Sequence, residues 1–576
     1  MPNTSPRPSL VLLPALLLLA GLLALAWWVP NRHAAGMVPP GGMSGADRLN
    51  SLSFAPFRPG QSPLTNRFPS AAEVEADLAV LAPVTRAIRT YAALEGNYDV
   101  PALAAKKGLK VWLGIWLGAD RAQNAKEIAR GIELANAHPD TVERVIVGNE
   151  VLLRRDLPVG ELIAAIDTVK RQVRQPVTYA DVWEFWEQFP DVAAHVDIVT
   201  IHLLPYWEDD PTSVAGAMAH IEAIYHRMAT RFAGQKIVIG ETGWPSAGRP
   251  RRDAVPARVA QARFIREFVA LAQRAGFDYN LIEAFDQVWK YKSEGTVGAA
   301  WGLFEADRTE KYPAGARVEE DPNWAAHAAI SVLLGGALLV IGLAGRALKP
   351  GAQARLAGVA MAAGGALVFA FAGTWPLVFD GHLLLAFAVN LPAQAALAIL
   401  LVRRAGAVLA GPVLADGVLA DEVLAGAAAP TSRTGAQASE AVRSLLRLRP
   451  AVPRDTAGWL DDLSFLFLWT AAVLQLLLLF DPRYRDFPLP VFAVPLLAVL
   501  ARAALRDLPR HGGGREELFA GGTLALAALA SAVMEGRLNA ASLVWNAAAL
   551  VLAAPALVRL AAPALVRLRP CGRGKT

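Results

Sequence analysis

The chain reads Val145-Ile146-Val147-Gly148-Asn149-Glu150 at one point and Ile237-Val238-Ile239-Gly240-Glu241 at another, the second followed by Thr242-Gly243-Trp244-Pro245-Ser246. Both segments are short apolar runs that end on a glutamate. Runs of this length and composition are typical of strands buried in a parallel sheet. Because neighbouring strands of one sheet end side by side, we expect the two carboxyl groups to lie together at its edge.

Strand-like segments recur throughout residues 47–323, with room for a helix between them, which is the pattern of parallel βα units. Ser70 and Glu73 form a capping box that marks the start of the first helix. The predicted helices include 70–82, 119–137, 158–174, 213–233 and 256–275, and the predicted strands are 51–57, 85–91, 110–116, 144–150, 177–181, 198–202, 237–241 and 280–285. Eight units predict a (β/α)8 TIM barrel, an α/β fold whose active site lies at the C-terminal strand ends. Glu150 would end the fourth strand and Glu241 the seventh.

Paired carboxyl groups at strand ends suit the chemistry of a retaining glycosidase. In that reaction one carboxyl group protonates the leaving oxygen while the other attacks the anomeric carbon, and the two lie roughly 5 to 5.5 Å apart. The acid needs a raised pKa and the nucleophile must stay ionised, so we expect their surroundings to differ. The alternative is that the glutamates only cap a helix or pair with an arginine.

Several motifs together resemble glycoside hydrolase family 17. They are Gly148-Asn149-Glu150, the block from Gly240 to Ser246, and Glu283-Ala284-Phe285-Asp286 with Trp289-Lys290. The resemblance covers residues 47–323 and implies action on β-1,3-glucan by double displacement. It implies Glu150 as general acid/base, Glu241 as nucleophile, and Asn149 as a donor to the sugar 2-hydroxyl.

Two positions depart from the family pattern. His202-Leu203-Leu204-Pro205-Tyr206-Trp207 stands where plant-type enzymes have an aromatic-rich stretch, and Gln287 stands where an acidic residue is frequent. Polytopic bacterial versions of this barrel are associated with β-glucan remodelling by glucosyl transfer.

Aromatic residues fall at or just after several predicted strand ends, where their faces can pack against sugar rings. The candidates are Tyr91, Trp116, Tyr206, Trp244, Trp289 and Trp301, with core packing as the alternative for each. His202 could orient a catalytic carboxylate, bind the sugar or be structural. Further candidates for binding sugar hydroxyls are Asp181, Asp286 and Lys290, which could instead only hydrogen-bond loops.

The sequence indicates no cofactor. It has no His/Cys cluster with metal-ligand spacing and no Gly-rich phosphate loop. The only cysteine is Cys571, so the barrel must be stable without a disulfide bond. A pI near 9.3 could suggest a nucleic-acid partner, but the basic residues lie largely in loops between apolar runs, so we expect none.

The rest of the chain is rich in alanine and leucine and predicts an all-α polytopic membrane domain. The first apolar run, residues 10–29, is longer than a signal-peptide core and predicts an uncleaved anchor, with cleavage near Ala34-Ala35-Gly36 as the alternative. Seven more runs follow at about 325–345, 357–378, 383–402, 463–480, 488–505, 517–534 and 541–561. Each is close to the ~20 residues that cross a bilayer.

These runs define the expected domain organisation. The segments are an anchor (1–30), a tether (31–46), the barrel (47–323), transmembrane helices 2–4 (324–404), a flexible cytoplasmic linker (405–458), transmembrane helices 5–8 (459–562) and a basic cytoplasmic tail (563–576). Lys and Arg cluster in alternate loops, which predicts a multi-pass protein of the bacterial inner membrane with both termini cytoplasmic and the barrel periplasmic.

The expected function is a membrane-bound glucanosyltransferase that remodels β-1,3-glucan, with Trp244, Trp289 and Trp301 holding the acceptor sugar. Plain hydrolysis of β-1,3-glucan is the alternative. A non-enzymatic glycan sensor or scaffold is a further alternative. The expected partners are β-glucan and the lipid bilayer, and a membrane glucan synthase is a candidate.

Overall fold

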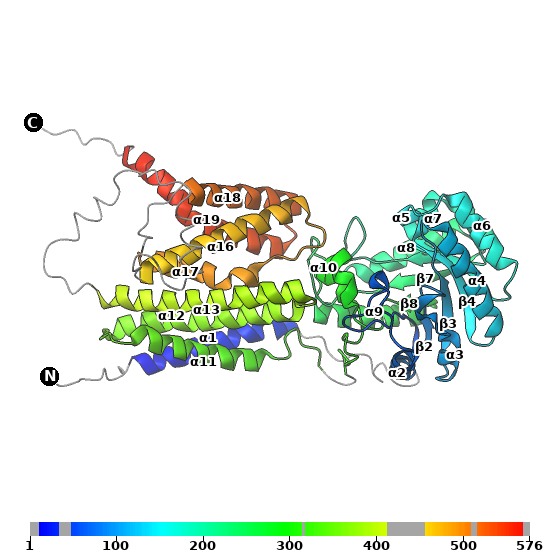
Figure 1. Cartoon of the computed structure of the whole chain (residues 1–576), viewed down its shortest axis with the longest axis horizontal. Coiled ribbons are helices and arrows are strands. Elements are labelled where there is room, and N and C mark those ends of the chain that lie inside the picture. The colour runs from blue at the N-terminus through cyan, green and yellow to red at the C-terminus, as the bar shows by residue number, and fades with distance from the viewer. Residues whose placement is uncertain (1–10, 34–47, 314–316, 412–455, 508–514, 568–576) are drawn as a thin grey trace, which may run out of the picture. The chain divides into compact units, whose positions relative to one another are not determined.

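The computed structural model describes residues 11–33, 48–313, 317–411, 456–507 and 515–567. The chain divides into two compact units, of which one comprises residues 33–320 and the other residues 1–32 together with 321–576. Figure 1 shows strands only in the first unit and long helices in the second.

The first unit is a closed barrel of parallel strands in the order β1 to β8, which confirms the predicted fold. Its strands are β1 (Leu49–Ser53), β2 (Thr85–Arg89), β3 (Lys110–Ile115), β4 (Val142–Asn149), β5 (Val177–Val182), β6 (Ile198–His202), β7 (Lys236–Thr242) and β8 (Tyr279–Leu281). Side chains from successive strands fill the barrel, among them Ala87, Trp112, Ile146 and Val238. The interior is therefore a packed core, and a ligand can bind only at a rim.

Helices surround the strands as the periodicity predicts. They are α2 (Ala71–Leu81), α3 (Val100–Ala105), α4 (Arg121–Ala137), α5 (Val151–Arg154), α6 (Val159–Lys170), α7 (Trp183–Gln188), α8 (Ala217–Arg231), α9 (Arg258–Ala275) and α10 (Tyr291–Ala299). The Ser70–Glu73 capping box begins α2 as expected. Helix α5 follows Glu150 directly, so it holds the backbone on the C-terminal side of this residue.

The second unit contains helices only. They are α1 (Leu12–Trp28), α11 (Trp324–Leu343), α12 (Pro350–Thr374), α13 (Gly381–Ala410), α16 (Thr456–Phe480), α17 (Ala493–Ala504), α18 (Arg515–Glu535) and α19 (Ala540–Arg567). Helix α1 packs against α11, where Trp27 Nε1 donates a hydrogen bond to Ser331 Oγ at 3.0 Å. Asn31 is also hydrogen-bonded to the backbone of Asp321 in both directions. The first apolar run is therefore an integral part of this unit.

Among the described residues, seven helices are long and apolar enough to cross a membrane, and the segment Leu489–Ala504 is shorter. The run at 488–505 is thus not the single continuous helix that its composition predicts. It consists of a 3₁₀ turn, η7 (Leu489–Phe492), followed by α17. Pro488 and Pro490 explain the break, because proline cannot donate a helical hydrogen bond.

Two amide side chains on α13 complete the hydrogen bonding of this broken segment. Gln394, which is fully buried, donates to the carbonyl of Pro490 at 3.2 Å and accepts from the N–H of Val494 at 3.0 Å. Asn390 donates to the carbonyl of Val491 at 3.2 Å. Backbone that leaves a regular helix in apolar surroundings requires such hydrogen-bond partners.

The expected linker at 405–458 is shorter than predicted at both ends. Residues 405–410 continue α13 because the sequence there is rich in alanine up to Gly411, and residues 456–458 already belong to α16. The remainder of the linker, most of the tether and the end of the basic tail lie outside the described residues. Arg404 near the end of α13 pairs with Asp507, and Arg502 of α17 pairs with Asp461 and Asp507. These ion pairs connect the ends of α13, α16 and α17.

Candidate active site

Glu150 lies immediately after β4 with left-handed backbone angles, φ 52° and ψ 33°. A non-glycine residue rarely adopts this conformation, and such residues concentrate at functional sites. Its N–H donates to the carbonyl of Ala180 on β5 at 2.8 Å. Gly148, at φ 82°, precedes it and lets the chain turn. The local sequence therefore directs the Glu150 side chain away from the regular path of the strand.

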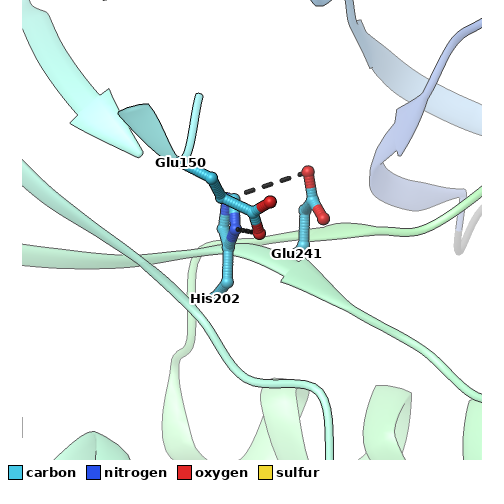
Figure 2. A group of neighbouring side chains, drawn as sticks. All are labelled: Glu150, His202 and Glu241. Atoms are coloured by element: carbon cyan, nitrogen blue, oxygen red, sulfur yellow. Dashed lines mark hydrogen bonds and ion pairs between the residues drawn. The ribbon is translucent and has the colours of Figure 1, made fainter. Parts of the chain in front are cut away.

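Figure 2 shows the side chains of Glu150, His202 and Glu241 gathered together, with that of Glu150 next to the His202 ring. One carboxylate oxygen of each glutamate and a ring nitrogen of His202 all lie within 4.8 Å of one another. Such donors could also surround a metal ion, although both ring nitrogens already face protein groups. The short separation of the carboxylates agrees with the spacing of a nucleophile and acid pair and is below the roughly 6.5 to 9.5 Å that leaves room for a water molecule between them.

Glu241 is buried within β7 and is held by two donors. Arg89 Nη1 donates to Glu241 Oε1 at 3.0 Å, and the Tyr91 hydroxyl lies 2.9 Å from the same oxygen. Burial and the charge of Glu241 raise the pKa of Tyr91 well above its usual value, so this hydroxyl keeps its proton. Tyr91, predicted as a sugar platform, thus lies where it can orient the carboxylate.

Glu150 has a different environment from that of Glu241, as expected. His202 Nδ1 lies 2.8 Å from Glu150 Oε1. Burial alone would raise the pKa of Glu150, yet the hydrogen bond from His202, with the positive charges of Arg154 and Arg89, outweighs burial and lowers it. The sequence pattern cannot show this, because the contact joins the ends of two different strands.

Arg89, the last residue of β2, was not predicted as a site residue. Besides contacting Glu241, its Nη2 donates to Asn149 Oδ1. This contact orients the amide of Asn149, so Nδ2 is the atom left to donate to a ligand. A buried arginine at a strand end, next to the predicted Tyr91, was the available sequence signal.

The predicted aromatic platforms divide into buried and accessible residues. Tyr206, Trp244 and Trp301 expose 0%, 1% and 2% of their surface, so they pack behind the site and present no open face to a sugar. Trp244 Nε1, for example, donates to the carbonyl of Val255 at 3.0 Å. Trp289 is half-buried against Phe57.

Trp116 is the most accessible of the predicted platforms, with 37% of its surface exposed. One face of its ring is covered by the guanidinium of Arg154, whose carbon lies 4.3 Å from the ring centroid. Arg154 also donates to the carbonyls of Asn149 and Leu117, which ties Trp116 to the segment that bears Glu150. Leu153, which exposes 40% of its surface, lies next to Arg154 on α5.

The predicted acidic ligands are structural. Asp181 is fully buried and accepts hydrogen bonds from the Tyr179 hydroxyl and the N–H of Val182, while burial raises its pKa to about 6. Asp286 accepts from Lys311 Nζ at 2.7 Å, and burial raises its pKa to about 7. At least one carboxylate oxygen of each side chain is therefore used within the protein.

Lys290 forms an ion pair with Glu283. Glu283 is part of the family motif, but the sequence alone assigned it no role. Lys290 Nζ is 3.0 Å from Glu283 Oε1. Burial lowers the pKa of Lys290, but Glu283 and Glu294 outweigh it and raise that pKa, so the ammonium stays charged. Burial raises the pKa of Glu283 to about 7.

Two residue types at the site can be explained by the structure: the glycine at position 240 by steric fit, and the glutamine at position 287 by hydrogen bonding. A Cβ at Gly240 would lie 2.5 Å from Thr200 Cγ2 and 3.1 Å from His202 Cδ2, so only glycine lets the histidine ring lie beside Glu241. Gln287, the departure from the acidic family residue, donates to the carbonyls of Ala55 and Phe285 and accepts from Trp289. A carboxylate could not make the two donations.

Comparison with known proteins places the similarity in the barrel. A family model for the BtgE/BtgC glycoside hydrolase domain matches residues 51–302. The chain is 32% identical over 255 residues to a glucan 1,3-beta-glucosidase of Schizosaccharomyces pombe, a match that covers 41% of this chain and 78% of that protein. A glucan 1,3-beta-glucosidase of Candida albicans is 28% identical over 261 residues, covering 41% of this chain and 84% of the relative. Among solved structures, a glycoside hydrolase family 17 beta-1,3-glucanosyltransferase from Rhizomucor miehei is 25% identical with a TM-score of 0.42, covering 47% of this chain and 100% of that one.

Proposed function

Because the chain belongs to the glycoside hydrolase family 17 β-1,3-glucanases, we propose that it is a retaining β-1,3-glucan transglycosylase in which Glu241 is the nucleophile and Glu150 the acid/base. The observation that carries this assignment is the pair of strand-end carboxylates within 4.8 Å of each other. A separation this short favours direct attack by one carboxylate over attack by an intervening water molecule.

The contacts of each carboxylate support its role. Arg89 and Tyr91 donate to Glu241 and orient it for attack on the anomeric carbon. Glu150 is less buried, with 22% of its side chain exposed, so it can meet both a leaving sugar and an incoming acceptor. The glucosyl group is attached to Glu241 between these two steps.

The acceptor side of the cleft is assigned to Trp116 and Leu153. The acid/base acts on the oxygen between the transferred sugar and the leaving sugar, so an apolar surface next to Glu150 suits the leaving and acceptor sugars. Trp116 and Leu153 are exposed and connected to the Glu150 segment through Arg154. This assignment replaces Trp244 and Trp301, whose rings are buried.

The products formed from a defined laminari-oligosaccharide at millimolar concentration test the proposal, with the full-length protein in detergent. Products longer than the substrate at the earliest time points support transfer, whereas shorter oligosaccharides and glucose alone support the hydrolase alternative. Trp116→Ala should lower the ratio of transfer to hydrolysis, with Leu64→Ala as an exposed control outside the Trp116 and Leu153 surface.

We further propose that the helical unit lies in the inner membrane of a bacterium, with the barrel in the periplasm and both chain termini in the cytoplasm. Seven long apolar helices and the alternation of Lys/Arg-rich loops support this placement. A barrel attached to the membrane at this position would act on β-glucan near its site of export, and a membrane glucan synthase is then the expected partner.

A further inference from the structure

His202 lies at the end of β6, close to both catalytic candidates, and is fully buried (Figure 2). Its Nδ1 is 2.8 Å from Glu150 Oε1, which is a hydrogen-bond distance. Its Nε2 is 3.8 Å from Glu241 Oε1, which is too long for a hydrogen bond. The ring is therefore bonded to the acid/base and only near the nucleophile.

The neighbours of Nε2 indicate which ring nitrogen carries the proton. Arg89 Nη1 and Nη2 lie 3.5 Å and 3.4 Å from His202 Nε2. A guanidinium group can only donate hydrogen bonds, so the ring atom that faces it presents a lone pair. The proton then lies on Nδ1 and points to Glu150.

We propose that His202 is a positioning residue that holds Glu150 Oε1 as an acceptor through its Nδ1–H, so that the proton of the acid resides on Glu150 Oε2. This inference rests on the proposed roles of the two glutamates. If His202 only filled space, the proton of Glu150 could occupy either Oε1 or Oε2. A proton on Oε1, which faces the histidine ring, could not be delivered to a sugar.

The proton balance of the reaction follows from this arrangement. In the first step Glu150 Oε2 gives its proton to the glycosidic oxygen as the bond from that oxygen to the anomeric carbon breaks and Glu241 bonds to the carbon. In the second step a hydroxyl of the acceptor bonds to the carbon, Glu241 leaves, and the hydroxyl proton returns to Glu150 Oε2. The Nδ1 proton of His202 is retained throughout.

Charged groups from four other strands surround the ring. They are Arg89 of β2, Glu150 after β4, Asp181 of β5 and Glu241 of β7. Burial raises the pKa of Asp181 to about 6, so its charge also changes within the range of an activity profile. The test therefore compares variants of His202 alone, in which the other groups are constant.

A matched pair of substitutions separates the two ring nitrogens. In His202→Asn the amide nitrogen occupies the place of Nδ1 and can still donate to Glu150, whereas in His202→Gln the amide occupies the place of Nε2 and Glu150 loses its donor. We expect His202→Asn to retain activity on laminari-oligosaccharides within about threefold. We expect His202→Gln to lose about tenfold or more, a part of the 10²–10⁴ that a general acid contributes.

Two further readouts distinguish positioning from packing. An aryl glucoside whose leaving group needs no proton should be processed by His202→Gln almost as well as by the natural protein. The basic limb of the pH profile of kcat/KM should move to higher pH in His202→Gln only, because the lost donor stabilised the charged form of Glu150. Equal losses in both variants on both substrates, or an unmoved limb, would overturn the proposal.

A measurement without substrate keeps this inference separate from the proposed function. The chain has nine histidines, so the nitrogen signals of His202 can be identified in histidine-labelled protein by their absence from His202→Asn. We expect the neutral ring to carry its proton on Nδ1. An Nε2–H tautomer would contradict the assignment, even in a protein that proves active on β-1,3-glucan.

Discussion

Arg89 contacts three of the residues assigned to the site, Glu241, Asn149 and His202. It donates to Glu241, to the carbonyl of Gly240 and to Asn149, and it faces His202. A single buried guanidinium thereby orients the carboxylate of Glu241 and the amide of Asn149. It also favours the tautomer of His202 whose lone pair is on Nε2. Guanidinium suits this task because its five donors have a fixed geometry and it cannot lose its proton.

The two glutamates should fail in different ways when replaced by alanine. Glu241→Ala loses the covalent intermediate and should be inactive on all substrates. Glu150→Ala should still cleave substrates with good leaving groups, and added azide should accelerate it, because a small anion can replace the acceptor that Glu150 no longer deprotonates. Rates with and without azide measure this difference. Equal, unrescued losses would contradict the assigned roles.

Gly240→Ala should damage the site without touching a reacting group. The added Cβ would collide with Thr200 and the His202 ring, and overpacking of this kind costs about 1–3 kcal/mol of stability. We expect a lower midpoint of thermal unfolding and a loss of activity. Gly160→Ala on α6 is the control, because nothing lies within 4 Å of its added Cβ. Similar behaviour of the two variants would show that the Gly240 contact is unimportant.

The sequence predicted those site residues whose position follows from a strand and its end. Glu150, Glu241 and Asn149 belong to this group. It did not predict which aromatic rings are open, since Trp116 and Trp301 both follow strand ends yet differ in exposure, 37% against 2%. Packing by loops from elsewhere in the chain decides this exposure. The lowered pKa of Glu150 has the same origin, because it depends on a contact between β4 and β6.

At the scale of elements, hydropathy predicted where helices form but not that one of them is broken. Residues 489–504 have the composition of a span, yet only Ala493–Ala504 is α-helical. A 3₁₀ turn of four residues and an α-helix of twelve extend about 26 Å together, close to the ~30 Å of a hydrocarbon core. The segment can therefore still cross as an interrupted span.

Gln394→Leu tests the support of this interruption. The substitution leaves the carbonyl of Pro490 and the N–H of Val494 without their side-chain partner, and a buried unsatisfied group costs about 1–3 kcal/mol. We expect thermal unfolding of the helical unit in detergent at a lower temperature, with the activity of the barrel unchanged. Val389→Leu, exposed on the same helix, is the control. An unchanged unfolding temperature would mean that water or lipid satisfies these groups instead.

At the scale of the whole molecule, the number of crossings decides the side on which the chain ends. Seven long helices alone would place the two ends on opposite sides, whereas α17 as an eighth crossing places them on the same side. The Lys/Arg-rich loops favour the second arrangement.

Reporter fusions measure this directly. A reporter inserted near Gly42 should be active only in the periplasm, and one after Thr576 only in the cytoplasm. Periplasmic activity after Thr576 would show that α17 does not cross. Cytoplasmic activity at Gly42 would overturn the external placement of the barrel.

The barrel unit is an insertion within the helical unit, since residues 1–32 and 321–576 belong together. During synthesis α1 must therefore wait for the entire barrel unit to be made before α11 can pack against it through Trp27. Once both helices have packed together, two chain segments connect the barrel unit to the helical unit. A single protease cut in either segment leaves the barrel unit attached, so only cuts in both would release it.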